Sequence, residues 1–224
     1  MFRYSLIFLA IMSLVGCGLG PVPVDPLALP SNLPSGVRLF VVEGQESMVG
    51  YEVVEEFLPQ AETVIGRKMA ERIKTTRAAT SDIEGYIAVD FSAETPTLHA
   101  AVFAVHLPTL KSNRHERDQM IRAHWLQSGD FPQATFIASE MSDFYMVENG
   151  LTASFTLSGE LTIRDVTVPI RLETIAKVEG DRLIGTASAE LMMTDFGFNP
   201  PKILTAVVVE NAFTLWVELT AVEQ

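Results

Sequence analysis

The stretch TASFTLSGELTI, residues 152–163, alternates regularly between two kinds of residue. Every second residue in it belongs to one set of apolar residues and glycine: Phe155, Leu157, Gly159, Leu161 and Ile163. Because successive side chains of a strand point to opposite faces of a sheet, this alternation predicts a β-strand with one buried face.

Further runs of the same β-rich character lie on both sides of this stretch. They are separated by turn residues such as Gly180-Asp181 and Asn199-Pro200-Pro201, and they cover residues 37–42, 83–91, 97–107, 166–178, 183–193 and 207–222. About eight to ten strands with short connections, and no alternation of strand and helix, predict an all-β antiparallel barrel or sandwich. The sequence shows no internal repeat and no second domain boundary.

One segment, residues 113–128, breaks the strand pattern and predicts a helix. Asn113, followed three residues later by Glu116, is typical of a capping box, and Gly129 marks the end of the segment.

One face of this helix is expected to pack on the barrel. Ile121 and Trp125 are four residues apart and share a face, and Asp118 lies close to both around the helix. Asp118 is also one turn away from Arg114 and from Arg122, so we expect an ion pair with one of them.

The N-terminal residues predict export and lipid anchoring. Residues 1–16 combine a basic residue, Arg3, with an apolar run that is too short to span a bilayer, as in a secretory signal peptide. The run ends in LVGC, residues 14–17, which resembles the lipobox of bacterial lipoproteins. That resemblance implies a lipidated Cys17 at the start of the mature chain, and an extracytoplasmic protein held at a membrane, in the periplasm or at the cell surface. Cys17 is the only cysteine in the sequence, so it has no disulfide partner within the chain.

A proline-rich segment follows the cysteine. Residues 17–35 contain five prolines, which disfavour helix and sheet and favour an extended chain. We therefore expect a tether at residues 17–35 and one folded domain at residues 36–224. A disordered leader without a spacing role is the alternative.

Charge and motifs exclude several classes of function. Without residues 1–16 the chain keeps 15 basic and 28 acidic residues, a net charge of −13, because Arg3 is the one charge removed. That balance argues against nucleic acid as a partner. There is no glycine-rich phosphate loop, and we expect no cofactor.

Metal and catalytic motifs are also incomplete. The sequence HERDQ, residues 115–119, begins like a zinc-protease helix but has Gln119 where the second histidine would stand. His115 and His124 are nine residues apart, on different helical faces, so we expect no metal site. No serine stands in a Gly-x-Ser-x-Gly motif, and we expect no enzyme.

Six short motifs, taken in order, resemble the YceI family. They are TLKS (109–112), RDxxIR (117–122), FPxAxF (131–136), FxLxGELTI (155–163), VTxPI (166–170) and DFGF (195–198). The similarity is weakest at residues 44–82. It implies a lipocalin-like antiparallel barrel of about eight strands with one helical segment. It also implies an exported bacterial protein that binds polyisoprenoid chains inside the barrel.

A barrel of this kind predicts an apolar cavity and residues that line it. The candidates are Phe103, Val105, Phe136, Phe155, Leu157, Phe196 and Phe198, with Ile121 and Trp125 of the helix sealing one end. Strand periodicity gives two faces but does not say which one points inward. Two alternatives therefore stay open. A surface interaction module would have a filled barrel and an exposed Trp125 or Trp216. A hydrolase would have a His–carboxylate pair in a cleft. The oligomeric state is open as well.

Overall fold

A computed structural model describes residues 26–66, 68, 70–147, 151–203 and 206–224. The predicted signal peptide, Cys17 and the first part of the predicted tether lie outside the described residues. Within them, the chain forms an antiparallel β-barrel with a short helical segment, as the alternation of residues 152–163 and the family resemblance predicted.

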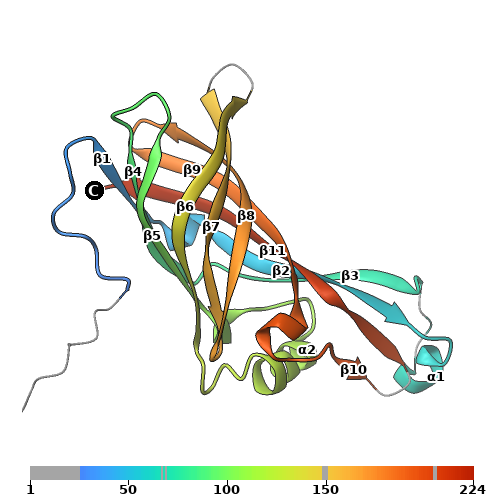
Figure 1. The fold of residues 1–224 in the computed structure, drawn as a ribbon. Helices are drawn as coiled ribbons and strands as arrows, with labels where there is room; N and C mark the ends of the chain where they lie inside the picture. The colour runs from blue at the N-terminus through green and yellow to red at the C-terminus, as the bar shows by residue number, and fades with distance from the viewer. Residues whose placement is uncertain (1–25, 67, 69, 148–150, 204–205) are drawn as a thin grey trace, which may run out of the picture.

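Eight strands close the barrel (Figure 1). In spatial order they are β1 (Val37–Val42), β4 (Ile83–Asp90), β5 (Thr97–His106), β6 (Gln133–Val147), β7 (Thr152–Ile163), β8 (Val166–Glu179), β9 (Arg182–Met192) and β11 (Val207–Glu223). The ring closes because β1 pairs with β4 on one side and with the end of β11 on the other. Since every neighbour is antiparallel, short connections suffice for most of the chain.

The stretch that predicted the fold is strand β7, between β6 and β8. Leu157, Leu161 and Ile163 are buried, so the alternating face points into the core. Gly159 belongs to the same face, and a Cβ atom there would lie 2.8 Å from the ring of Phe136 and 2.3 Å from the carbonyl oxygen of Ile137. Glycine at this position therefore leaves the space that the aromatic ring of the neighbouring strand occupies.

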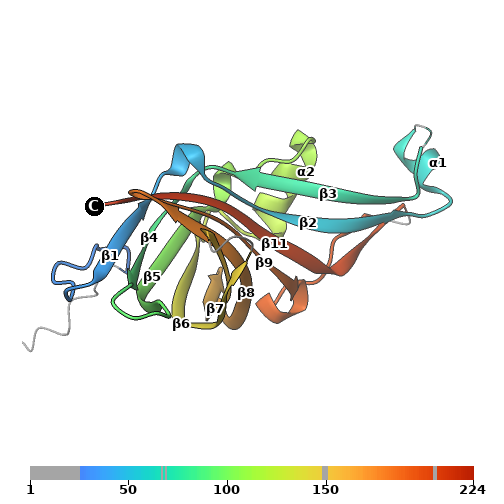
Figure 2. The same ribbon diagram turned by 90° about the horizontal axis from the view of Figure 1, so that it is seen from above.

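A hairpin extends the sheet beyond the barrel. Strand β2 (Met48–Phe57) pairs with the first part of β11 and with β3 (Ile73–Thr80). Figures 1 and 2 show these three strands running past the barrel toward helix α1 (Ala61–Ile65) and the short strand β10 (Lys202–Ile203). A separate apolar cluster holds this extension together: Val53, Phe57, Ala61, Met193, Ala206, Val207 and Val209. Strands β2 and β3 are not among the runs that the sequence analysis singled out.

The predicted helical segment is present, in two parts. An α-helix, α2 (His115–Met120), continues into a turn of π-helix, η3 (Ile121–Trp125). Three short 3-10 turns complete the structure: η1 (Gly44–Glu46), η2 (Leu107–Thr109) and η4 (Met193–Phe196). No helix among the described residues has both the length and the apolar character that crossing a bilayer requires.

The predicted cap of this helix is wrong. The N-cap residue is Arg114, which makes no side-chain capping bond. Asn113 instead accepts a hydrogen bond from the guanidinium of Arg117 at 3.2 Å. Asn113 lies two residues before the first helical residue, His115, which is one position too early to cap the helix, so its side chain is free for this other partner.

The predicted ion pair of Asp118 is also wrong. Its carboxylate accepts hydrogen bonds from the backbone N–H of Ser112, at 2.9 Å, and from the Ser112 hydroxyl, at 2.6 Å. Arg122 donates to the carbonyl oxygens of Pro108 and Leu110. Both side chains thus fasten the helix to the loop before it, because these contacts lie on the buried side of the segment, where Asp118 is 7% exposed.

Candidate functional site

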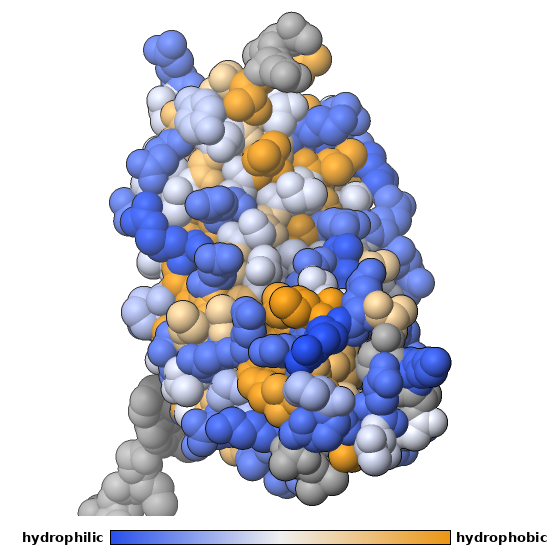
Figure 3. Space-filling view, turned by 90° about the vertical axis from the view of Figure 1, so that its right-hand side faces the viewer, coloured by the Kyte–Doolittle hydropathy of each residue, from blue (hydrophilic) through white to orange (hydrophobic). Residues whose placement is uncertain are grey.

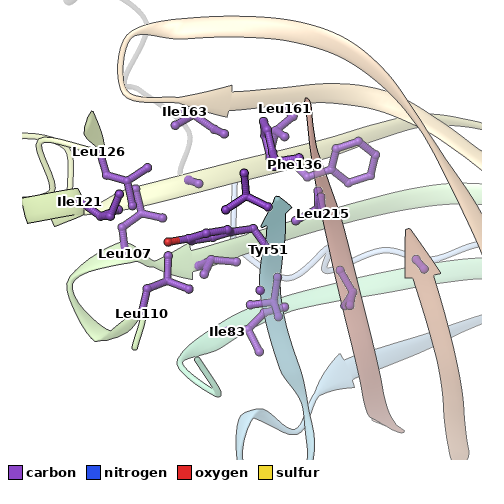
Figure 4. A pocket seen from close by; sticks show the side chains of 18 of the residues that line it. Tyr51, Ile83, Leu107, Leu110, Ile121, Leu126, Phe136, Leu161, Ile163 and Leu215 are labelled. Carbon is purple, nitrogen blue, oxygen red and sulfur yellow. The ribbon is translucent and has the colours of Figure 1, made fainter. Parts of the chain in front are cut away.

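The interior of the barrel holds a cavity of about 530 Å³. Its lining comes from both the barrel strands and the β2–β3 hairpin, and the helical segment closes one side. Figure 4 shows the mostly apolar side chains around it. A pocket of this volume and lining is typical of sites for small or elongated apolar molecules.

Six of the seven predicted cavity residues line this space: Phe103, Val105, Phe136, Phe155, Leu157 and Phe198. Phe196 is not part of the lining. It is 0% exposed and packs in the core, with its ring centre 6.3 Å from that of Phe213. Gly197 separates the two phenylalanines with a φ of 74°, a conformation that suits glycine, so the chain turns sharply between them.

The register of the barrel brings the lining residues together. Phe103 of β5 stands opposite Phe136 of β6, and Phe136 stands opposite Leu161 of β7. Further along the same face, Phe155 stands opposite Thr174 of β8. Because directly opposite residues in a sheet share a face, one inward residue fixes the orientation of its neighbours around the ring.

The helical segment forms one wall of the cavity and is fastened in place. Ile121 and Trp125 both line the space, as the shared helical face suggested, whereas Asp118 does not. The indole N–H of Trp125 donates to the carbonyl oxygen of Asn199 at 2.9 Å, and Arg164 donates to the carbonyl oxygen of Trp125 at 3.2 Å. A π-helical turn is rare and is frequently found at functional sites.

The cavity reaches the surface beside α2. Glu116 and Met120 line it, and both are exposed. Figure 3 shows the side of the molecule that carries β3, β10 and α1, where hydrophobic residues are visible near the middle of the face between hydrophilic ones.

Polar groups gather at the helical end of the cavity. Arg117 of α2 donates to Glu55 of β2 at 3.1 Å, and their side chains are 15% and 9% exposed. Nearby, burial raises the pKa of Tyr51 to about 12. Arg117 opposes this rise, and Asp118 and Glu55 add to it. In Figure 4 the phenol of Tyr51 extends toward Leu107 and Ile121.

Sequence reasoning missed the contribution of β2 to this site. The segment VGYEVVEEF, residues 49–57, places Val49, Tyr51, Val53, Glu55 and Phe57 on one face, and all five line the cavity. The alternation of period two was present as a signal. Glu55 and Glu56 weaken that signal, because acidic residues are more often exposed than buried.

The hydrolase alternative predicted a His–carboxylate pair in a cleft, and the pair that the described residues form lies outside the cavity. His106 does lie 2.9 Å from a carboxylate oxygen of Asp82, but the two side chains are 44% and 55% exposed, and neither lines the cavity. His115 and His124 do not line it either. Among the described residues, no group of three or more His, Cys, Asp or Glu side chains is placed to hold a metal ion.

The alternative of a filled barrel also lacks support. Its interior would be closed by side chains, yet about 530 Å³ is open. Trp216, which that alternative placed at the surface, is 8% exposed.

Comparisons with known proteins agree with this architecture. A family model described as "YceI-like domain" matches residues 56–221. A UPF0312 protein from Shewanella oneidensis is 32% identical over 114 residues, which are 48% of this chain and 56% of the relative. A similar relative from Shewanella baltica is 33% identical over 117 residues, 48% of this chain and 58% of the relative. The chain therefore spans little more than half the length of these curated relatives.

Solved structures share the fold at low sequence identity. BcnA of Burkholderia cenocepacia has a TM-score of 0.58 and 16% identity, over 80% of this chain and 99% of that one. A polyisoprenoid binding domain from Saccharophagus degradans, implicated in plant cell wall breakdown, has a TM-score of 0.56 and 10% identity, over 83% and 98%. A Campylobacter jejuni YCEI protein has a TM-score of 0.52 and 18% identity, over 75% and 96%. With the family model covering well over half of its residues, the chain belongs to the YceI family.

Proposed function

We propose that this protein binds an isoprenoid-type apolar lipid chain in its barrel and carries it without altering it chemically. The observation that carries the proposal is the cavity of about 530 Å³, whose walls are mostly aliphatic and aromatic side chains. A related fold, the domain from Saccharophagus degradans, is described as polyisoprenoid binding, which supports the same class of ligand here.

Burial of the chain alone supplies enough free energy for useful affinity. Each methylene-sized group that leaves water contributes about 0.8 kcal/mol. A few five-carbon units therefore reach micromolar affinity or better, even after the loss of translational and rotational freedom on binding. The apolar walls thus bind the tail without any polar contact.

The second part of the proposal concerns location. Lipidation at Cys17 would hold the barrel at a membrane, outside the cytoplasm, and residues 17–35 would act as its tether. The LVGC sequence at residues 14–17 and the five prolines of the tether support this. A carrier anchored in this way would be close to the bilayer in which its ligand dissolves.

Two experiments test these two parts separately. Organic extracts of the purified protein, analysed by mass spectrometry, should contain an apolar isoprenoid lipid. If they contain none, and if the purified protein also takes up no polyprenol from vesicles, the binding proposal is overturned.

For the anchor, cells grown with labelled palmitate should yield a labelled wild-type protein and an unlabelled Cys17→Ala variant. Equal labelling of the two proteins, or no label on the wild type, would contradict lipidation at this residue.

A further inference from the structure

Four polar side chains interrupt the apolar wall at one end of the cavity. Tyr51 and Glu55 come from β2, Thr76 from β3 and Arg117 from α2, and all four line the same space. The rest of the wall is mostly apolar and would accept any apolar chain, whereas this cluster of Tyr51, Glu55, Thr76 and Arg117, the polar end, can contact a polar group of the ligand.

The register of the hairpin places three of these residues side by side. Val53 of β2 stands opposite Thr76 of β3. Tyr51 and Glu55 flank Val53 at two positions on either side, so each is a diagonal neighbour of Thr76 on the inner face. Arg117 reaches the same spot from the helix, 3.1 Å from Glu55.

Two hydroxyl groups in this cluster have no partner in the protein. The Thr76 hydroxyl is buried without a hydrogen-bond partner in the described part of the chain, and the residue is 3% exposed. The Tyr51 hydroxyl likewise forms no hydrogen bond to a described residue and points into the cavity (Figure 4). A buried hydroxyl without a partner, such as that of Thr76, is rare in folded proteins and calls for an explanation. A ligand oxygen at this place would offer an acceptor to the Tyr51 hydroxyl and, after a rotation of its side chain, to the Thr76 hydroxyl.

The charges around these hydroxyls are balanced. Among the residues that line the cavity, Arg114 and Arg117 are offset by Glu55 and Glu116. Arg117 is already bonded to Glu55, and the carboxylate of Asp118 is buried beside it. A phosphate would therefore meet no excess of positive charge, and moving its charge out of water would go uncompensated.

Resting on the proposed function, we infer that the polar end receives the head of the bound lipid and selects an apolar chain that ends in an uncharged oxygen, a hydroxyl or a carbonyl, over the same chain ending in phosphate. Tyr51 is protonated at neutral pH, as any tyrosine is, and so is a donor to that oxygen. The family model begins at residue 56, so Tyr51 and Glu55 lie outside the matched segment. The selectivity thus rests in part on residues beyond the shared family pattern.

Three probes that share one apolar tail and differ in their head group distinguish the contribution of the head to binding from that of the chain. Farnesene (hydrocarbon), farnesol (alcohol) and farnesyl phosphate would each compete with the fluorophore N-phenyl-1-naphthylamine for the purified protein. Wild type should bind farnesol about tenfold more tightly than farnesene, as expected for one or two net hydrogen bonds, and should bind farnesyl phosphate less tightly than farnesol.

Variants that lack the two hydroxyls test the assignment. Tyr51→Phe combined with Thr76→Val should remove most of the advantage of farnesol over farnesene while farnesene still binds, and the binding of farnesene shows that the cavity is intact. Tyr86→Phe is the matched control, because Tyr86 is buried in a cluster outside the cavity and its substitution should preserve the tenfold difference. Thr76→Val alone should also raise the melting temperature of the empty protein by roughly 2–4 °C, since it removes an unpartnered hydroxyl.

The possible failures are distinguishable. If none of the probes binds, both the proposed function and this inference are overturned. If farnesene and farnesol bind equally, if farnesyl phosphate binds most tightly, or if the double variant keeps the preference for farnesol, the inference is wrong while the proposed binding of an apolar chain stands.

Discussion

The guanidinium of Arg117 on α2 donates a hydrogen bond to the carboxylate of Glu55 on β2, across 3.1 Å and 62 residues of sequence. Both side chains are largely buried, at 15% and 9% exposed. The pair joins the helical wall of the cavity to the hairpin that extends the sheet. The docking of the helix and the polar end of the cavity therefore depend on the same two residues.

Removing one member of this pair should destabilise the fold. Arg117→Met leaves the Glu55 carboxylate buried without its partner, and the free energy of unfolding should fall by about 3 kcal/mol. Urea unfolding of Arg117→Met, Glu55→Leu and the double variant forms the test. The double variant should lose less than the sum of the two single losses, because it leaves no unpaired charge behind. Strictly additive losses would show that the two side chains do not stabilise one another.

Filling the cavity should abolish uptake of an apolar ligand while the barrel stays folded. Ala187 of β9 is partly buried and lines the cavity, so Ala187→Phe would place a ring in the open space. Glu190→Phe is the control, because Glu190 lies on the same strand but is exposed. Fluorescence of N-phenyl-1-naphthylamine should rise with wild type and with Glu190→Phe, and should rise little with Ala187→Phe. Equal uptake by all three proteins would place the binding site elsewhere.

The bond between Trp125 and Asn199 should slow the release of ligand. Trp125→Phe keeps an aromatic ring in the wall but removes the N–H that donates to the Asn199 carbonyl at 2.9 Å. The loss of one net hydrogen bond, about 1 kcal/mol, should accelerate dissociation of the fluorophore roughly fivefold in stopped-flow measurements.

Trp216→Phe provides the comparison for this variant. The indole N–H of Trp216 has no partner among the described residues, and Trp216 does not line the cavity. Its substitution should leave the dissociation rate unchanged. If both variants release ligand at the wild-type rate, the Trp125 bond does not hold the wall in place.

Tyr51 should make stability depend on pH in the alkaline range. Its pKa is about 12 in the folded protein, against 10.0 for an ordinary tyrosine. Below pH 10 both states keep the proton, so this residue contributes no pH dependence. As the pH rises from 10 toward 12 the unfolded state loses its proton first, and stability falls. At pH 11.5 the loss relative to pH 9 should be about 2 kcal/mol greater for wild type than for Tyr51→Phe. Equal losses would mean that the phenol is solvated.

The periodicity of the apolar residues predicted the local secondary structure, and the strands predicted in this way agree with the structure. The alternation of residues 152–163 appears as β7, and the break in that alternation appears as α2 and η3. Local patterns failed where a side chain had a choice of partners. Asn113 is an acceptable cap residue, but its side chain accepts a hydrogen bond from Arg117 instead. Asp118 accepts a hydrogen bond from Ser112 rather than pairing with an arginine of its own helix.

The candidate site also contains features that local sequence patterns do not predict. Phe196 and Phe198 are equivalent by composition, yet one is packed in the core and the other lines the cavity, because Gly197 turns the chain between them. Tyr51, Thr76, Glu55 and Arg117 lie far apart in the sequence, and no local spacing connects them.

The β-rich composition, the period of two, the helical segment near residues 113–128 and the family all follow from the amino-acid sequence. These features depend on neighbours within a few residues, where side-chain direction follows from backbone geometry alone. The three-dimensional fold adds three further facts: which face of each strand points inward, that β2 and β3 join the cavity wall, and that four distant polar groups meet at one end of an apolar space. Those outcomes depend on the register with which the ring of strands closes, because the pairing of β1 with both β4 and β11 fixes every residue around the barrel at once.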